Sequence, residues 1–413
     1  MSKKRIVYIL LAVSLVLNGA FFVAGCNGGL PGMKDLLGEN DGAQTENVYS
    51  DEADSSEYSK EIRSKLSAID EIINKYYLND TEINQQEMLE GIYSGYVNGL
   101  GENYTTYYTA EEYTQLMESS SGEYSGIGVS VSQNLNTGII TVVDPFENGP
   151  GYEAGMRPED ILYEVEGEEV TGVDINQVVA RIKGEEGTTV DLTVYRPSTD
   201  EYIDMTVERR MVENPTVEYE MKEDQIGYIK ISEFDEVTVD QFLEAVDQLV
   251  AQGAAGLIFD LRNNPGGLME SVCEMLDRLL PEGLLVYTMD KDGNKEEQMA
   301  DDQQSLKIPM VVLVNGNSAS ASEIFTGALK DYQWATIMGT TTFGKGIVQL
   351  VIPMNDGSAV KVTNSKYYTP NGVCIHGEGI APDIEVEYDS EYEGDNQLDA
   401  ALTQIREMIS EQA

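Results

Sequence analysis

Apolar side chains recur along the early part of the chain at the spacing of a helix. One stripe repeats every three or four positions, as one face of a helix does: Ile62, Leu66, Ile69, Ile73 and Tyr76. Such a stripe belongs to a protein core more often than to a contact between subunits. Together with residues 101–108 and 111–113, it predicts a helical N-terminal portion over residues 59–120.

The apolar period changes after residue 120. Residues 125–131 alternate between apolar and polar after a glycine turn, and residues 138–143 form a second candidate strand. Residues 174–183 return to a helical pattern. These elements predict a separate folded unit over residues 121–212.

Strands and helices alternate through residues 213–389. Three short apolar runs predict buried strands: 227–231, 257–261 and 311–314. Residues 240–252 and the segment that follows Gly267 predict helices between them. This alternation is typical of a mixed α/β core.

The last segment, residues 390–413, predicts a final helix. One face of it is apolar: Leu398, Leu402, Ile405 and Ile409. We expect this face to pack on the body of the protein or to contact another subunit.

The first 26 residues predict export and attachment to a membrane. Lys3, Lys4 and Arg5 precede a mainly apolar run over residues 6–25, and no comparable run follows. The residues Val-Ala-Gly-Cys that end at Cys26 also match a bacterial lipobox, which would place a diacylglyceryl group on Cys26. An uncleaved signal anchor is the open alternative. Either anchor predicts an extracytoplasmic body, at the bacterial cell surface or in a periplasm-like space.

Composition narrows the partners and the chemistry. The 413-residue chain carries a formal charge of −47 and has a pI near 4.1, so nucleic acid is not an expected partner. Residues 27–58 are rich in small, polar and acidic side chains, which predicts a flexible acidic linker. Cys273 and Cys374 make no disulfide framework, and Cys273 is expected to be a buried free thiol. We expect no metal and no organic cofactor.

A serine and a lysine are the candidate catalytic pair. Ser320 lies among small residues, and Lys345 follows 25 positions later between Gly344 and Gly346. A nucleophilic serine needs a neighbouring base, and the chain contains a single imidazole, that of His376. A lysine base is the more economical interpretation. It requires burial to lower the lysine pKa from roughly 10.4 to about 7–8.

The residues around this pair resemble the carboxyl-terminal processing (tail-specific) serine peptidases. The resemblance rests on three segments in a fixed order, residues 260–267, 318–323 and 344–349, and extends from about residue 61 to residue 383. It implies a mixed α/β fold in which a crotonase-like Ser-Lys peptidase core carries an inserted PDZ domain. It implies no cofactor.

The same resemblance implies a role for each residue of the site. Ser320 would be the nucleophile, Lys345 the general base and Gln349 the group that orients the lysine. The oxyanion hole would combine the backbone N–H of Ala321 with that of Gly266 or Gly267. Ser320 also fits a helix capping box with Glu323, and the two interpretations are compatible because a helix start exposes N–H groups that can bind an oxyanion.

Residues 149–162 and 165–167 resemble the body of a PDZ domain. PDZ domains bind peptide C-termini by strand addition and hold the terminal carboxylate with backbone amides of a glycine loop. The peptide-binding residues would be Gly126, Ile127 and Gly128 in the loop, with Val129, Val178 and Ile182 as the side-chain pocket. A plain turn and plain core packing explain these residues equally well.

The sequence therefore predicts an exported, membrane-tethered serine endopeptidase that cleaves proteins near a free C-terminus after the PDZ domain recognises the tail. The resemblance also permits a homodimer formed through the N-terminal helices. The alternative is a catalytically silent PDZ protein that binds or scaffolds the same peptides.

Overall fold

The structure is a computed structural model that describes residues 21–23, 57–79, 83–301 and 305–412. Within these residues, no helix has both the length and the apolar character needed to cross a bilayer. The predictions for Cys26, for most of the apolar run and for nearly all of the acidic linker lie outside the described residues. Residues 21–23 form strand β1 (Phe21–Val23), which pairs in parallel with residues 349–351.

The predicted alternation of strands and helices forms a six-stranded sheet. Its strands, in spatial order, are β11 (Val217–Lys222), β12 (Ile226–Ile231), β13 (Gly256–Asp260), β16 (Met310–Val314), β17 (Thr336–Gly339) and β20 (Ile384–Glu385). The strands from β12 to β20 run parallel, and β11 lies antiparallel at one edge.

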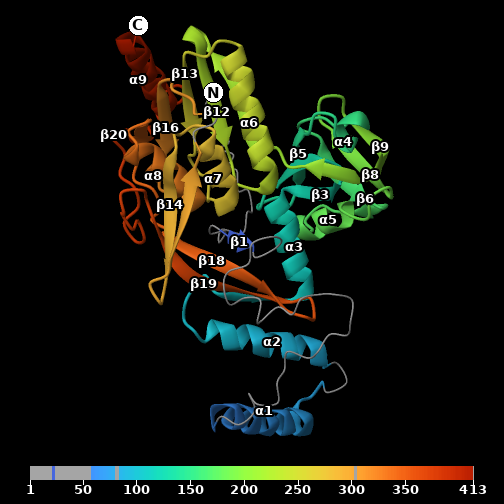
Figure 1. The fold of residues 1–413 in the computed structure, drawn as a ribbon. Coiled ribbons are helices and arrows are strands. Elements are labelled where there is room, and N and C mark those ends of the chain that lie inside the picture. The colour runs from blue at the N-terminus through green and yellow to red at the C-terminus, as the bar shows by residue number, and fades with distance from the viewer. Residues whose placement is uncertain (1–20, 24–56, 80–82, 302–304, 413) are drawn as a thin grey trace, which may run out of the picture.

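Helices cover both faces of this sheet (Figure 1). Three helices pack on one face: α6 (Glu236–Ala251), α7 (Met269–Asp277) and α8 (Ala321–Asp331). Helix α9 (Asn396–Gln412) covers the other. Strand side chains alternate between faces, so Leu257 and Phe259 join the three-helix side while Ile258 joins the α9 side. Because both faces are covered, every residue of β13 is buried.

A second sheet lies beside the first. Its main strands are β18 (Ile347–Pro353), β19 (Ala359–Tyr368), β14 (Gly283–Asp290) and β15 (Lys295–Ala300). The short strand β2 (Thr106–Tyr108) pairs antiparallel with residues 359–361 of β19.

Strand β2 corrects the prediction that residues 101–108 are helical. Thr105 and Tyr107 are buried here, and the backbone hydrogen bonds go to β19 rather than to a helical turn. Local pattern cannot reveal a partner strand more than 250 positions away, so tertiary pairing overrides it. Helix α3 (Ala110–Ser121) follows directly and contains residues 111–113, as predicted.

A smaller unit has its own sheet and its own core. The sheet contains β4 (Val129–Gln133), β5 (Ile140–Pro145), β6 (Ile161–Val165), β7 (Glu168–Glu169), β8 (Thr189–Arg196) and β9 (Glu201–Glu208). Helices α4 (Pro150–Glu153) and α5 (Ile175–Ile182) belong to the same unit. Strands β3 (Glu123–Gly126) and β10 (Arg210–Glu213) pair antiparallel, so the chain enters and leaves the unit side by side.

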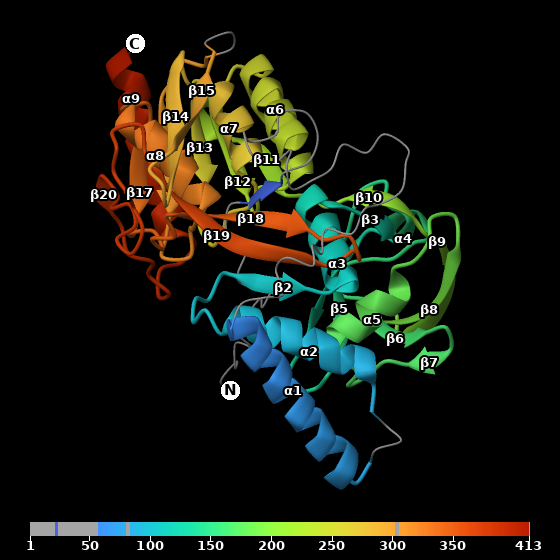
Figure 2. The same cartoon turned by 60° about the horizontal axis from the view of Figure 1, so that its bottom comes forward.

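The first two helices contradict the expectation that their apolar stripe belongs to a core. Helices α1 (Glu57–Tyr76) and α2 (Gln85–Asn98) contain no buried residue, and Ile69 and Tyr76 are 44% and 70% exposed. Helix α1 extends away from the sheets, and α2 lies under β2 (Figure 2). The described residues of one chain thus leave the amphipathic face of α1 uncovered.

Candidate active site

Ser320 directly precedes α8 in a strained backbone conformation. Its φ is 57° and its ψ is −114°, a combination that residues with a side chain rarely adopt. Its amide donates to the Glu323 carboxylate at 2.9 Å, and its carbonyl accepts from the Tyr367 hydroxyl at 3.0 Å. Ser320 and Tyr367 are both fully buried. Backbone strain that surrounding contacts hold in place is typical of functional sites.

The predicted oxyanion groups lie against Ser320. Gly266 is so close that a Cβ on it would lie 2.8 Å from the Ser320 Cβ and 3.0 Å from the Ala321 nitrogen. The Gly266 N–H is occupied, because it donates to the Asn264 side chain at 2.8 Å. Within the described residues, the N–H groups of Gly267 and Ala321 donate to no protein acceptor. The geometry therefore favours Gly267 over Gly266 as the partner of Ala321.

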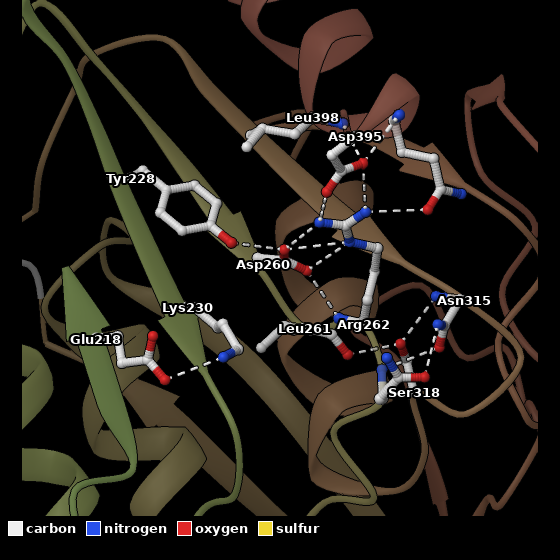
Figure 3. A network of polar contacts seen from close by, with 12 residues as sticks. Glu218, Tyr228, Lys230, Asp260, Leu261, Arg262, Asn315, Ser318, Asp395 and Leu398 are labelled. Atoms are coloured by element: carbon white, nitrogen blue, oxygen red, sulfur yellow. Dashed lines mark hydrogen bonds and ion pairs between the residues drawn. The ribbon is translucent and has the colours of Figure 1, made fainter. Parts of the chain in front are cut away.

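A polar network holds the loop that carries these glycines. The Arg262 guanidinium lies between the carboxylates of Asp260 and Asp395 and bonds to each at 2.6–3.1 Å (Figure 3). Asp395 directly precedes α9, so the network links the C-terminal helix to the start of the loop. At the neighbouring residue, the Ser318 hydroxyl donates to the Leu261 carbonyl at 2.7 Å. The start of the loop is thus fixed.

Lys345 is buried in the segment that precedes β18. It is 4% exposed, and its pKa is lowered to about 7, first by burial and then by the nearby charge of Lys361. Its Nζ lies 4.4 Å from the centre of the Tyr104 ring. Gly346 has no room for a side chain, since a Cβ would lie 2.6 Å from the His376 nitrogen. This close backbone approach is what the flanking glycines were expected to permit.

One buried carboxylate joins Ser320 to the lysine segment. Glu323 Oε2 accepts from the amides of Ser320 and Lys345, and Oε1 accepts from the Thr342 hydroxyl and the Gly344 amide, at 2.6–2.9 Å. Burial raises the pKa of Glu323, and the hydrogen bonds oppose that rise. Glu323 was expected only as a helix cap, yet its carboxylate fixes the two candidate catalytic segments to each other.

Gln349 is the third predicted catalytic residue, and its side-chain amide is buried. It is fully buried on β18, and within the part of the chain that the structure describes neither its Oε1 nor its Nε2 has a hydrogen-bond partner. Among the described residues, the Lys345 amine makes no hydrogen bond to Ser320 or to Gln349, and it faces the Tyr104 ring instead. The structure thus gathers Ser320, the candidate oxyanion amides and the lysine segment, but leaves the lysine amine turned to Tyr104.

Neither His376 nor Cys273 fits a catalytic role. His376 is exposed, whereas Ser320 is buried. Cys273 is a free, buried thiol whose pKa burial raises to about 12, as expected for a core residue.

Comparisons with known proteins agree on one family. Residues 225–386 match the model of peptidase family S41, and residues 139–196 match that of the PDZ domain. The carboxy-terminal processing protease CtpB of Bacillus subtilis (strain 168) is 32% identical over 387 residues, which cover 93% of this chain and 78% of that protein. This chain belongs to peptidase family S41.

One further relative supports this S41 assignment, and one solved structure shares the fold. A probable CtpA-like serine protease of Staphylococcus epidermidis is 37% identical over 333 residues, which cover 79% of this chain and 66% of that protein. The match therefore spans about two thirds of that relative's length. A putative S41 protease from Bacteroides fragilis has the same fold, with a TM-score of 0.51 at 16% identity over 82% of this chain and 97% of that chain. The resemblance to carboxyl-terminal processing peptidases with a PDZ domain is confirmed.

The candidate peptide-binding residues of the S41 chain lie at the start of its PDZ unit and on α5. Gly126 ends β3, Gly128 has a φ of 64°, and Val129 begins β4. Ile127, Val178 and Ile182 are 1–6% exposed and belong to the core of the unit.

Sequence reasoning missed several residues of the S41 site. They are Glu102, Tyr104, Glu323, Lys361 and Tyr367. The capping-box position of Glu323 was the one signal available in the sequence. Glu102 and Tyr104 reach the site because the strand after them, β2, pairs with β19. Lys361 and Tyr367 lie on β19 itself.

Proposed function

We propose that this S41 peptidase is an exported, membrane-tethered serine endopeptidase that cleaves proteins near their C-terminus by Ser-Lys catalysis. The proposal rests on two features of the described residues: a strained serine beside two amides that donate to no protein acceptor there, and a buried lysine whose pKa is lowered to about 7. A lysine with that pKa is about half neutral at pH 7, so it can accept a proton there.

In the proposed reaction, the neutral Lys345 Nζ takes the proton of the Ser320 hydroxyl as Ser320 Oγ attacks the scissile carbonyl. The N–H groups of Ala321 and Gly267 stabilise the oxyanion. The Lys345 ammonium then protonates the leaving amine, which leaves an acyl-enzyme on Ser320. Lys345 next takes a proton from water as the water oxygen attacks the ester carbonyl, and it returns that proton to Ser320 Oγ as the bond from Oγ to the carbonyl carbon breaks and the acid product leaves.

The reaction requires the Lys345 amine to turn from Tyr104 toward Ser320. The orphaned amide of Gln349 supplies a reason for that movement. A buried polar group without a partner costs about 1–3 kcal/mol, and a hydrogen bond from the lysine to Gln349 Oε1 would recover part of that cost. Gln349 is therefore proposed to orient the lysine in the competent site.

The PDZ unit is proposed to bind the free tail of a protein substrate and so raise its local concentration near Ser320. The anchor before residue 27 would hold the enzyme at the outer face of a membrane. Mass spectrometry of the mature N-terminus distinguishes a lipid-modified Cys26 from an uncleaved anchor.

Cleavage of a partly unfolded protein with an apolar tail tests the assignment. Ser320→Ala and Lys345→Ala are each expected to abolish turnover, and His376→Ala, in the exposed imidazole, is the matched control that keeps it. Circular dichroism checks that each variant folds. Turnover by a folded Ser320→Ala or Lys345→Ala protein would rule the mechanism out.

A second candidate function is peptide binding without cleavage. It is favoured by the full burial of Ser320 and by the absence of a Lys345–Ser320 hydrogen bond among the described residues. A tail peptide that binds the PDZ unit and returns intact from the wild-type protein would support it. Wild-type cleavage of the same peptide would exclude it.

A further inference from the structure

A second buried lysine lies on β19, the strand that pairs with β18 just after the proposed base. Lys361 is 3% exposed, and Lys345 is 4% exposed. Lys361 lies on β19, where it pairs with Val351 of β18 and with Thr106 of β2. Gln349 and Val351 point to the same face of β18, because strand side chains alternate. Lys361 therefore lies on the face of the sheet that carries the proposed lysine-orienting residue.

One segment of the chain contacts both lysines. The Tyr104 ring lies 4.4 Å from Lys345 Nζ, and the Tyr108 ring lies 5.3 Å from Lys361 Nζ. The Glu102 carboxylate fastens this segment to β19, since it accepts from the Thr363 hydroxyl at 3.2 Å and from the Thr105 amide at 2.7 Å. Each of the two buried lysines thus faces a ring of the same short segment, residues 104–108.

We propose that Lys361 is a positioning residue for the proposed proteolysis: its charge, held beside Lys345, keeps the catalytic amine unprotonated. The inference rests on the proposed function and adds to it a residue that does not touch substrate. A neighbouring cation is a known way to activate a buried lysine, because two positive charges in a low dielectric repel each other.

The surrounding charges give the sign of the effect. Glu102 and Glu323 are the carboxylates near Lys345, and both raise its pKa, whereas Lys361 lowers it. Lys361 itself has a pKa lowered to about 8 by burial, with Glu102 opposing. A proton on Lys361 therefore favours the neutral form of Lys345, because the two positive charges repel each other.

The test is the pH dependence of kcat/KM for the full-length protein. Lys361→Met is expected to move the acid limb of the kcat/KM profile to higher pH, by roughly half a pH unit to one pH unit. Compared with wild type, this means about 3- to 10-fold less activity at pH 6.5 and a difference below about twofold at pH 9. Glu102→Gln is expected to move the limb the opposite way, and Lys361→Arg to leave its midpoint in place. Lys366→Met, in an exposed lysine of the same strand, is the control.

A second measurement does not depend on turnover. In a Ser320→Ala background labelled with ¹³C-lysine, NMR titration of the Lys345 side chain gives its pKa directly, with Lys345→Ala assigning the signal. A higher midpoint after Lys361→Met supports the inference. An unmoved midpoint, or an equal loss of activity at every pH, overturns it. If the wild-type protein cleaves no substrate, while Lys361→Met still moves the NMR midpoint of Lys345, the result would instead count against the proposed function.

Discussion

At the scale of single residues, the site depends on groups that must accept hydrogen bonds. Glu323 receives four donors on its two oxygens. In Glu323→Gln, an amide NH₂ must face two of those donors, so we expect a loss of about 2–3 kcal/mol of stability and a fall in kcat larger than the change in KM. Thermal unfolding and steady-state kinetics measure the two effects. A variant with wild-type Tm and kcat would contradict this role.

Asp235 predicts a pH dependence of stability. Burial, with help from Glu233 and Glu236, raises its pKa from 3.8 to about 8. Because the folded pKa lies above the unfolded one, stability is lost as pH rises from about 4 to about 8. Asp235→Asn keeps a capping acceptor and removes the charge, so its Tm should exceed that of wild type by several degrees at pH 8 and match it near pH 4.

The exposed Asp292 provides the control for that series, since Asp292→Asn should follow the wild-type Tm at every pH. A constant Tm difference between Asp235→Asn and wild type from pH 4 to pH 8 would contradict the account.

The sequence was sufficient for some residues of the site and insufficient for others. Ser320 and Lys345 stand in motifs, so their types and spacing identify them as candidates. Tyr104 and Lys361 carry no local signal, because their importance comes from pairing between β2 and β19. The choice of Gly267 over Gly266 also needed coordinates, since only the Asn264 side chain distinguishes the two amides.

At the scale of elements, the C-terminal helix supports the loop that carries Gly266 and Gly267, through the contact of Asp395 with Arg262. Asp395→Asn removes one of the two carboxylates on Arg262, and Asp260 remains. Since the Asp395 side chain is 35% exposed, we expect only about 1 kcal/mol of lost stability, with kcat lowered more than KM is changed. Glu407→Gln, on the exposed surface of the same helix, is the control. Equal kinetics for the two variants would show that α9 does not position the loop.

The apolar pattern predicts helices and strands correctly where the element does not depend on a partner far along the chain. The strand at 257–261 and the helices near 240–252 and 174–183 were predicted from period alone, and they appear as β13, α6 and α5. The helix prediction for residues 101–108 was wrong because their partner strand lies far along the chain. The apolar stripe of α1 suggests a core, but the spacing of apolar residues indicates only that one helix face is apolar and not what covers that face.

At the scale of the whole molecule, the described N-terminal helices expose apolar side chains. Ile72, Tyr76 and Tyr77 are 54–70% exposed on or next to α1. We propose that a second copy covers this face, which predicts a homodimer in light scattering. Ile72→Glu should shift the mass toward the monomer, whereas Glu71→Gln should not. A wild-type monomer at all concentrations tested would contradict the proposal.

The most direct test of the central claim is covalent labelling of the protein with a serine-reactive acylating probe, followed by peptide mass spectrometry. The account predicts a single adduct on Ser320, at a rate that rises with pH around a midpoint near 7, the pKa of Lys345. Lys345→Ala should slow the labelling by about 100-fold or more, in keeping with the loss of a general base. Labelling of another residue, or a wild-type rate in Lys345→Ala, would contradict Ser-Lys catalysis.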